Sequence, residues 1–352
     1  MKNIRNYSLL GHNTFGIDAT CDRFVEFSSV SELLAFVRRN PLSGEGAAPL
    51  LILGGGSNLL LTGDFHGTVV HSAIMGIECI SSFLPSPSTA RETPSRSLLV
   101  RVGSGVVWDD FVAHCVDQGW HGAENLSLIP GEVGASAVQN IGAYGVEAAD
   151  LIERVEAVEL STGRQVVFER EECRYGYRQS RFKQDWKGRY LVTHVTYRLS
   201  TAFEPKLDYG NIRAALAEQS VDKPTPQQLR QTIIAIRQSK LPDPQVLGNG
   251  GSFFMNPVVP TEKYRELAAQ YPAMPHYEVD ADHVKIPAGW LIEQCGWKGR
   301  SLGQAGVHDR QALVLVNLGG ATGSEIVSLC DAIRSDVSGK FGIDIRPEVN
   351  IV

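Results

Sequence analysis

Three glycine-rich segments are the first candidates for chemistry in this chain. They cover residues 54–58 (GGGSN), 102–105 (VGSG) and 129–145 (IPGEVGASAVQNIGAYG). Main-chain N–H groups can converge on a phosphate where no Cβ intervenes, and glycine permits such loops. One such segment alone is more often a plain turn, and the third is equally compatible with a buried turn. Three in the first half of one chain favour a bound dinucleotide.

The two common nucleotide fingerprints are absent from the sequence. The segment that begins at residue 54 lacks the third glycine of a Rossmann loop, and no G-K-[ST] sequence completes a P-loop. A dinucleotide must therefore be held by another arrangement. The third segment is nearly uncharged, and its polar side chains able to form hydrogen bonds with a ligand include Gln139, Asn140 and Tyr144. This composition suits packing around a pyrophosphate and flat rings.

Three polar side chains could supply charge or a proton. Arg178 can hold a carboxylate through two parallel hydrogen bonds. Ser252 follows glycines and precedes Phe253 and Phe254, which would exclude water, and Glu348 lies on the polar face of the last predicted strand. From the residues alone each has a simpler interpretation: a surface ion pair, a turn hydroxyl and a solvated glutamate.

Composition limits the class of protein. A length of 352 residues predicts two or three compact units, and the net charge of -6 lacks the basic footprint of nucleic-acid binding. The six cysteines are scattered without a C-x-x-C pair, so we predict no metal site and buried free thiols in a reducing compartment. The start of the chain does not resemble a signal peptide, and no apolar run could span a bilayer. We therefore expect a cytoplasmic protein with no membrane, nucleic-acid or obligate protein partner.

Hydrophobic periodicity predicts the elements that position these residues. Ser29 and Glu32 form a capping box that opens a helix, and Thr322 and Glu325 form a second one. Residues 81–97, rich in Ser and Pro, are expected to be a surface excursion between two strands. The other predicted features are a buried strand at 49–53, a helix at 107–118, a strand at 193–199, a domain boundary within 221–245 and a half-buried strand at 343–352.

Five motifs, taken in order along the chain, resemble the UDP-N-acetylenolpyruvoylglucosamine reductase family. They are LGGGSNL (53–59), IPG through NIGAYG (129–145), YGYR (175–178), GGSFFMNP (250–257) and PEV (347–349), and the early NTFG (13–16) also fits. Together they are very specific and span nearly the whole chain. LDYGN (207–211) and SKLPDP (239–244) match the long form of the family. Met255 stands where the family usually has Lys or Arg, so a charged contact there is not carried over.

The resemblance implies an α+β fold. It consists of a two-lobed FAD-binding domain of the vanillyl-alcohol-oxidase type and a C-terminal α+β substrate-binding domain. We expect residues 1–72 with 343–352 to form the first FAD-binding lobe, residues 73–241 the second, and residues 242–342 the substrate-binding domain.

The resemblance also implies a reaction. NADPH reduces UDP-N-acetylglucosamine enolpyruvate to UDP-N-acetylmuramate, a peptidoglycan precursor, through noncovalent FAD. It makes Arg178 the partner of the substrate carboxylate, Ser252 the proton donor and Glu348 a general acid or enol stabiliser. It assigns the diphosphate and sugar to Tyr209, Lys240, Asn256, Lys298 and Gln311, and the uridine to Tyr277. It assigns FAD to Gly54, Gly55, Gly56, Ser57, Asn58, Pro130, Gly131, Gly134, Ser136, Asn140, Gly142, Ala143, Tyr144 and Gly145.

Two other functions remain open on the sequence alone. One is a flavin-dependent alcohol or lactone oxidase with the same FAD-binding fold, against which the motifs around Ser252, Glu348 and Tyr209 argue. The other is a nucleotide-binding protein without catalytic activity. Both would retain the glycine-rich segments, so the family motifs alone distinguish them from the reductase.

Overall fold

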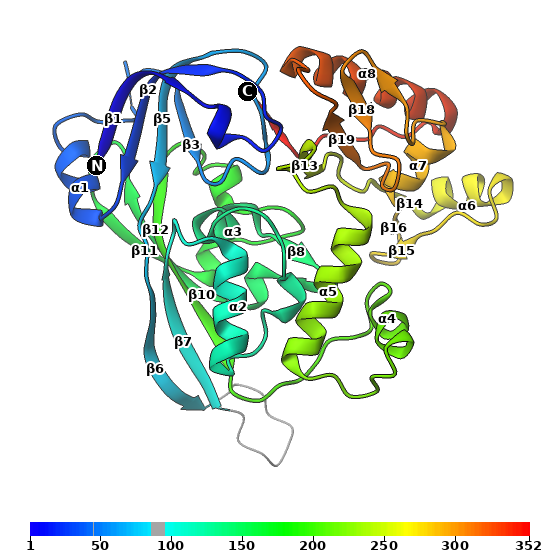
Figure 1. Ribbon diagram of the computed structural model, residues 1–352, viewed down its shortest axis with the longest axis horizontal. Helices are drawn as coiled ribbons and strands as arrows, with labels where there is room; N and C mark the ends of the chain where they lie inside the picture. Colours follow the sequence, from blue (N-terminus) through cyan, green and yellow to red (C-terminus); the bar gives the residue numbers. More distant parts are fainter. Residues whose placement is uncertain (45, 86–95) are drawn as a thin grey trace. The chain divides into compact units, whose positions relative to one another are not determined.

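The computed structural model describes residues 1–44, 46–85 and 96–352 (Figure 1). The chain divides into two compact units, each built from three segments of sequence. Unit 1 comprises Met1–Tyr7, Cys21–Gly55 and His66–Ser239, and unit 2 comprises Ser8–Thr20, Gly56–Phe65 and Lys240–Val352. Helices and strands occur in both units, which is the α+β composition that the sequence predicts.

Unit 1 begins with a four-stranded sheet. Its strands, in spatial order, are β1 (Lys2–Ser8), β2 (Thr20–Phe27), β5 (Phe65–Ser72) and β3 (Leu50–Leu53). Helix α1 (Val30–Val37) packs on this sheet through Leu33, Phe36 and Val37, which are buried. The Ser29 side chain accepts a hydrogen bond from the Glu32 N–H, so α1 begins at the predicted cap.

A second, five-stranded antiparallel sheet forms the larger core of unit 1. Its strands, in spatial order, are β11 (Gln165–Glu169), β10 (Ile152–Glu159), β12 (Tyr190–Ser200), β7 (Arg96–Gly103) and β6 (Ile77–Pro85). Helices α2 (Trp108–Gln118) and α3 (Val133–Gln139) pack in the same core (Figure 1). The Trp108 ring contacts the rings of Phe111 and Tyr197 at centroid distances of 5.6 and 5.7 Å. The Trp108 N–H donates to the Gly131 carbonyl at 3.0 Å, which holds the loop that precedes α3.

Unit 1 also contains a hairpin and two further α-helices. The hairpin consists of β8 (Gly142–Ala143) and β9 (Val146–Glu147), and the helices are α4 (Ile212–Glu218) and α5 (Pro226–Lys240). Leu229, Ile233 and Ile236 of α5 form a small apolar core with α4, and Tyr144 packs against it. The hairpin turn is thereby joined to α5.

Unit 2 contains three small sheets and three helices. The first sheet has four strands, in spatial order β13 (Gly248–Ser252), β19 (Val314–Asn317), β18 (Ala305–Val307) and β17 (Ser301–Leu302). The second has three strands, in the order β14 (Val258–Pro260), β16 (His283–Lys285) and β15 (Tyr277–Glu278). The third pairs β20 (Asn350–Ile351) with β4 (Leu59–Leu60). The helices are α6 (Thr261–Gln270), α7 (Ala288–Gln294) and α8 (Gly323–Phe341). The capping box of Thr322 and Glu325 opens α8, as predicted.

Three sequence predictions need correction. The tail is not one strand, because only Asn350–Ile351 pairs as such. Ile343, Ile345 and Val349 are buried as the alternation predicts, but Ile351, on the same predicted face, is 41% exposed. The surface segment between the two strands is shorter than the predicted 81–97, because β6 continues to Pro85 and β7 begins at Arg96. Residues 86–95, the rest of that prediction, lie outside the described residues. The cysteines were predicted to be buried; Cys21, Cys115, Cys173 and Cys330 are, whereas Cys79 is exposed and Cys295 is half-buried.

The segment 221–245 contains more order than its composition suggests. Residues 226–240 form helix α5, which the sequence analysis missed, although the division between the two units falls at its end. Among the described residues, no helix is long and apolar enough to cross a membrane.

Candidate active site

The three predicted glycine-rich segments meet inside unit 1. A Cβ added to Gly55 would lie 3.2 Å from Cα of Gly131, and one added to Gly134 would lie 2.8 Å from Cβ of Ser104. The Gly134 N–H donates to the Ser104 carbonyl at 2.9 Å. Gly54 lies equally close, because its added Cβ would be 3.3 Å from Cβ of Ala135. The backbones of all three segments therefore approach one another where side chains would not fit.

Two predicted cofactor residues use their side chains inside the protein. Asn140 is fully buried; its Nδ2 donates to Glu147 at 2.8 Å and to the Gly176 carbonyl at 2.9 Å, and its Oδ1 accepts from the Ala149 N–H at 3.0 Å. The Ser136 hydroxyl, also buried, donates to the Val133 carbonyl at 2.7 Å. These side chains hold the shape of the loop.

Arg178 reaches the same loop through main-chain carbonyls. Its Nη2 donates to the Gly142 carbonyl at 2.7 Å, and its Nη1 donates to that of Asn140 at 3.4 Å. A Cβ added to Gly142 would lie 2.8 Å from Nη1 of Arg178, so a larger residue at 142 would displace the guanidinium. Arg178 itself has a φ of 54°, an unusual value for a residue other than glycine. Such local strain is often found at functional sites.

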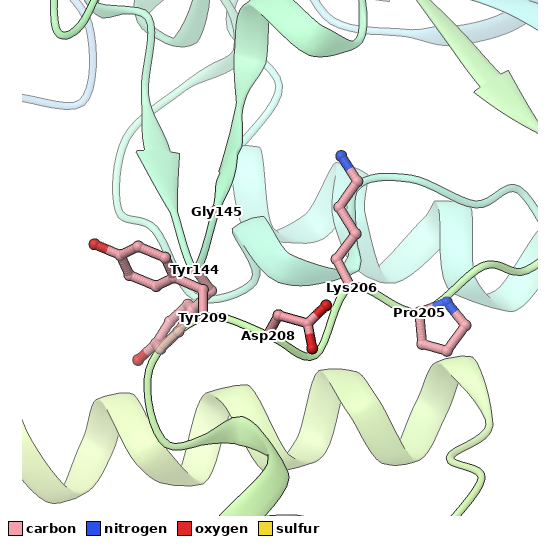
Figure 2. A pocket seen from close by; sticks show the side chains of 6 residues that line it. All are labelled: Tyr144, Gly145, Pro205, Lys206, Asp208 and Tyr209. Carbon is pink, nitrogen blue, oxygen red and sulfur yellow. The ribbon is translucent and has the colours of Figure 1, made fainter. Parts of the chain in front are cut away.

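A pocket of about 350 Å³ in unit 1 brings together three other predicted residues. It is lined by Tyr144, Gly145, Pro205, Lys206, Asp208 and Tyr209. Figure 2 shows the rings of Tyr144 and Tyr209 extending in the same direction from adjacent loops. A Cβ added to Gly145 would lie 3.3 Å from Cβ of Tyr209, so the two loops are in close contact. The predicted cofactor residue Tyr144 and the predicted substrate residue Tyr209 therefore lie together.

Asn125 connects the two loops of this pocket. Its Nδ2 donates to the Tyr144 carbonyl at 2.9 Å and to the Lys206 carbonyl at 3.0 Å. The Asn125 side chain is almost completely buried. The sequence analysis missed this residue, because its two partners lie 19 and 81 residues away in the sequence.

Unit 2 brings two predicted catalytic residues close together. Ser252 ends β13, and the carbonyl of the next residue, Phe253, accepts a hydrogen bond from the Glu348 N–H at 2.8 Å. The pairing continues, because the Met255 N–H donates to the Arg346 carbonyl at 2.9 Å. Residues 253–255 thus run beside residues 346–348, and the tail is held along its length.

The early glycine motif continues into this part of unit 2. A Cβ added to Gly56 would lie 1.9 Å from the His12 carbonyl oxygen. Asn58, which follows Ser57, donates through Nδ2 to the Glu348 carbonyl at 3.4 Å, and its own carbonyl accepts from the Asn350 N–H at 3.1 Å. Asn58 therefore fixes the main chain on both sides of Val349.

The remaining predicted substrate residues are distributed over unit 2. Asn256 and Gln311 lie beside α7: Oδ1 of Asn256 accepts from the Ala288 N–H at 2.9 Å, and a Cβ added to Gly289 would lie 3.1 Å from Oε1 of Gln311. Lys298 forms an ion pair with Glu293 at 2.9 Å. Tyr277 lies on β15 and is 47% exposed, and Lys240 is exposed at the end of α5.

Comparison with known proteins identifies the family. The model of an FAD binding domain matches residues 22–169, and that of the UDP-N-acetylenolpyruvoylglucosamine reductase C-terminal domain matches residues 243–352. A UDP-N-acetylenolpyruvoylglucosamine reductase from Bacteroides fragilis is 54% identical over 348 residues, which cover 99% of each chain. The chain belongs to the UDP-N-acetylenolpyruvoylglucosamine reductase family. A member from Porphyromonas gingivalis is 46% identical, with coverage of 99% of this chain and 98% of that protein.

A solved member of this reductase family shares the fold. The enzyme from Thermus caldophilus has a TM-score of 0.63 and 21% identity, covering 99% of this chain and 98% of that one. The predicted fold class is confirmed: an FAD-binding domain precedes a C-terminal α+β domain. The family assignment also confirms a flavoprotein oxidoreductase and does not favour the oxidase alternative.

The residues present fit FAD. The three glycine-rich segments converge within the matched FAD-binding domain, and added Cβ atoms at Gly54, Gly55 and Gly134 would lie 2.8–3.3 Å from the neighbouring segment. Main-chain N–H groups on such loops are suited to a diphosphate. The FAD would therefore be held by the segments around Gly54, Gly55, Gly131 and Gly134.

Two charged groups beside these segments escaped the sequence analysis. His71 on β5 lies between Glu26 and Glu132, at 3.0 Å from each, and Glu132 directly precedes α3. No local motif marks this cluster, because its members come from separate elements. Arg237 on α5 is the second group. An available signal was its spacing from Leu229 and Ile233, which places an arginine on the apolar face of a helix.

Proposed function

We propose that this protein catalyses the NADPH-dependent reduction of UDP-N-acetylglucosamine enolpyruvate to UDP-N-acetylmuramate, a step in forming peptidoglycan precursors. The observation that carries the proposal is the pairing of Phe253 with Glu348 at 2.8 Å, which places the motifs of Ser252 and Glu348 side by side. Full-length identity of 54% to a reductase of that name supports it. The substrate class is a small UDP-sugar.

The reaction adds a hydride and a proton across a carbon–carbon double bond. Bound FAD, held by the segments around Gly54, Gly55, Gly131 and Gly134, would supply the hydride-transfer chemistry between NADPH and the terminal carbon of the enolpyruvyl group. Negative charge then grows toward the substrate carboxylate, and the adjacent carbon must receive a proton. The protein supplies orientation, charge stabilisation and that proton.

Arg178 stabilises the negative charge that develops on the substrate during the reaction. Its guanidinium is held by the carbonyls of Asn140 and Gly142 and is oriented before the substrate arrives. A preorganised donor at a developing charge is worth roughly 3 kcal/mol or more of barrier lowering. We assign Arg178 to the enolpyruvyl carboxylate for this reason.

Ser252 delivers the proton and Glu348 assists. A serine hydroxyl is a poor acid, so a neighbouring group must support proton transfer through it. Glu348 is the acidic residue of the segment that runs beside residues 253–255, and its N–H is fixed on Phe253. We assign Glu348 the role of general acid or enol stabiliser.

The remaining substrate contacts follow from residue type. A diphosphate needs several donors, and Tyr209, Lys240, Asn256, Lys298 and Gln311 are assigned to the diphosphate and sugar. Tyr277, an exposed ring, is assigned to the uridine. We also propose the division into two FAD-binding lobes (1–72 with 343–352, and 73–241) and a substrate-binding domain (242–342). The free thiols of Cys21, Cys115, Cys173, Cys295 and Cys330 suit the reducing cytoplasm as the place of the reaction.

An absorption experiment tests the reaction. The purified protein is expected to be yellow, to bleach on anaerobic addition of NADPH and to recover its colour when the enolpyruvyl substrate is added. A colourless protein that takes up no FAD would contradict the proposal. So would a bleached flavin that is reoxidised by oxygen but not by the substrate.

A further inference from the structure

Arg237 occupies an unusual position for a charged residue. It follows Leu229 and Ile233 at intervals of four residues on α5, and these two residues form the apolar core with α4. Nε of Arg237 is buried and has no hydrogen-bond partner within the described part of the chain. A buried donor without a partner costs roughly 1–3 kcal/mol, and more when the group is charged. The energetic cost of burying Arg237 suggests that its guanidinium has a functional role.

The acid that acts on Arg237 is committed to another arginine. Asp109 of α2 acts on Arg237 electrostatically, but its Oδ1 and Oδ2 accept from Arg230 at 2.6 and 2.9 Å. Oδ1 of Asp109 also accepts from the Leu128 N–H at 2.5 Å. Asp109 therefore satisfies Arg230 and leaves Arg237 without a carboxylate ligand.

The group that does contact Arg237 belongs to the predicted site. The hydroxyl of Tyr144 is hydrogen-bonded to the Arg237 guanidinium, and the Tyr144 ring packs against the apolar core of α5. Tyr144 lines the pocket that also contains Tyr209 (Figure 2). Arg237 is thus one side chain away from this pocket.

A second cation lies within range of the first. Burial lowers the pKa of Arg237, and the positive charge of Arg178 lowers it further, against the opposing effects of Tyr144 and Asp109. Two guanidinium groups that repel each other in a partly desolvated region are stabilised when an anion binds near both. Bidentate guanidinium groups suit the oxygen atoms of carboxylates and phosphates.

We propose that Arg237 binds an anionic oxygen group of a ligand, a carboxylate or a phosphate, beside Tyr144 and acts with Arg178 to position it. This inference rests on the proposed function, which supplies two candidate ligands. The UDP-sugar substrate carries a carboxylate and a diphosphate, whereas NADPH carries phosphates alone. Arg237 is a positioning residue in either case, and the tyrosine limits where the anion can lie.

Two variants of Arg237 test the proposal. Arg237→Gln removes the charge and keeps polar atoms, and Arg237→Lys keeps the charge without the planar fork. Lys223→Gln, at an exposed position shortly before α5, is the matched loss of a positive charge. Melting temperature and FAD content are measured first, to establish that each variant is folded and loaded.

The decisive measurements are ligand titrations of the bound flavin absorbance, with KM and kcat for each ligand. We expect Arg237→Gln to raise Kd and KM for one ligand at least tenfold, Arg237→Lys to be intermediate and Lys223→Gln to match the wild type. Added guanidinium ion, at concentrations that leave the wild type unaffected, should partly restore binding in Arg237→Gln. An effect on the enolpyruvyl substrate alone assigns the anion to it, and an effect on NADPH alone assigns it to NADPH.

Other outcomes overturn the proposal. Unchanged Kd for both ligands in folded, FAD-loaded Arg237→Gln would exclude an anion at this residue. Loss of FAD with a folded chain would make Arg237 a cofactor residue instead, and a general loss of stability without guanidinium rescue would make it structural. Turnover of the wild-type protein tests the proposed function independently of these variants. If the wild type showed no NADPH-dependent turnover, the proposed function would be refuted whatever the role of Arg237.

Discussion

Nε2 of His71 lies 3.0 Å from a carboxylate oxygen of Glu132, and Nδ1 of the same ring lies 3.0 Å from Glu26. An imidazole can donate to two carboxylates only when both nitrogens are protonated, so this arrangement requires a cation. Burial disfavours that charge, but the hydrogen bonds and charges of Glu132 and Glu26 outweigh it and raise the pKa of His71. Lys2, 2.7 Å from Glu26, completes the cluster.

This cluster predicts how stability depends on pH. A raised folded pKa means that the contribution of His71 is fully present below its unfolded pKa of about 6.5 and is lost as pH rises through the folded value. Glu26 has the opposite dependence on pH. Burial raises its pKa, but the hydrogen bonds and charges of Lys2 and His71 lower it overall. The stability that Glu26 contributes is therefore lost as pH falls through its folded pKa. The melting temperature should therefore decline as pH rises beyond about 6.5.

Substitution of His71 should remove this dependence. His71→Gln leaves two partly buried carboxylates without their cation, for an expected cost of about 2–3 kcal/mol in unfolding free energy. Retention of FAD should fall with it, because Glu132 carries the loop next to Gly54. His66→Gln, on the same strand but with a side chain that is 85% exposed, is the control. Equal pH profiles for the two variants, from thermal melts at a series of pH values, would rule out the role of His71.

Gly134→Ala should weaken FAD binding even though alanine favours helices. An added Cβ would lie 2.8 Å from Cβ of Ser104, which belongs to a neighbouring glycine-rich segment and cannot move freely. Gly339→Ala in α8 is the matched control, because nothing lies within 4 Å of its added Cβ. The control should gain about 0.5–1 kcal/mol of stability. FAD content and thermal melts check both, and full FAD retention in Gly134→Ala would refute the packing argument.

Ser252→Ala should separate the two half-reactions. Reduction of the flavin by NADPH should be unchanged, while reoxidation by the enolpyruvyl substrate should slow by about 10²–10⁴-fold, the range for a lost proton donor. Stopped-flow absorbance measures both steps. Ser301→Ala, an exposed serine on β17, should leave both rates unaltered. Equal slowing of both steps in Ser252→Ala would exclude the proton-donor role.

Glu348→Gln should give the same pattern as Ser252→Ala while FAD content stays normal. The Glu348 N–H bond to Phe253 involves the main chain and survives the substitution. Loss of flavin in this variant would mean that the side chain maintains the structure rather than the chemistry. FAD content is measured by absorbance after gel filtration, alongside the stopped-flow rates.

Local signals in the sequence predicted more of this molecule than its long-range contacts. The caps at Ser29 and Thr322 depend on residues three positions apart, so the sequence displays them directly. The sequence displays the three glycine-rich segments as candidate phosphate-binding loops, but only the structure shows that they meet in unit 1. The His71 cluster was missed because its acids lie 45 and 61 residues away. Helix α5 was missed because Pro, Asp and Gln around it suggested a boundary.

Asn125 provides a test of whether the Tyr144 and Lys206 loops act as one unit. Asn125→Ala leaves two carbonyl groups without their donor, for an expected cost of about 1–3 kcal/mol in unfolding free energy. Because Tyr144 and Tyr209 line the same pocket, the KM for the UDP-sugar should rise with this loss. Asn40→Ala, which removes an exposed amide at the end of α1, should change neither. A loss of stability with an unchanged KM would show that Asn125 supports the fold without positioning Tyr209.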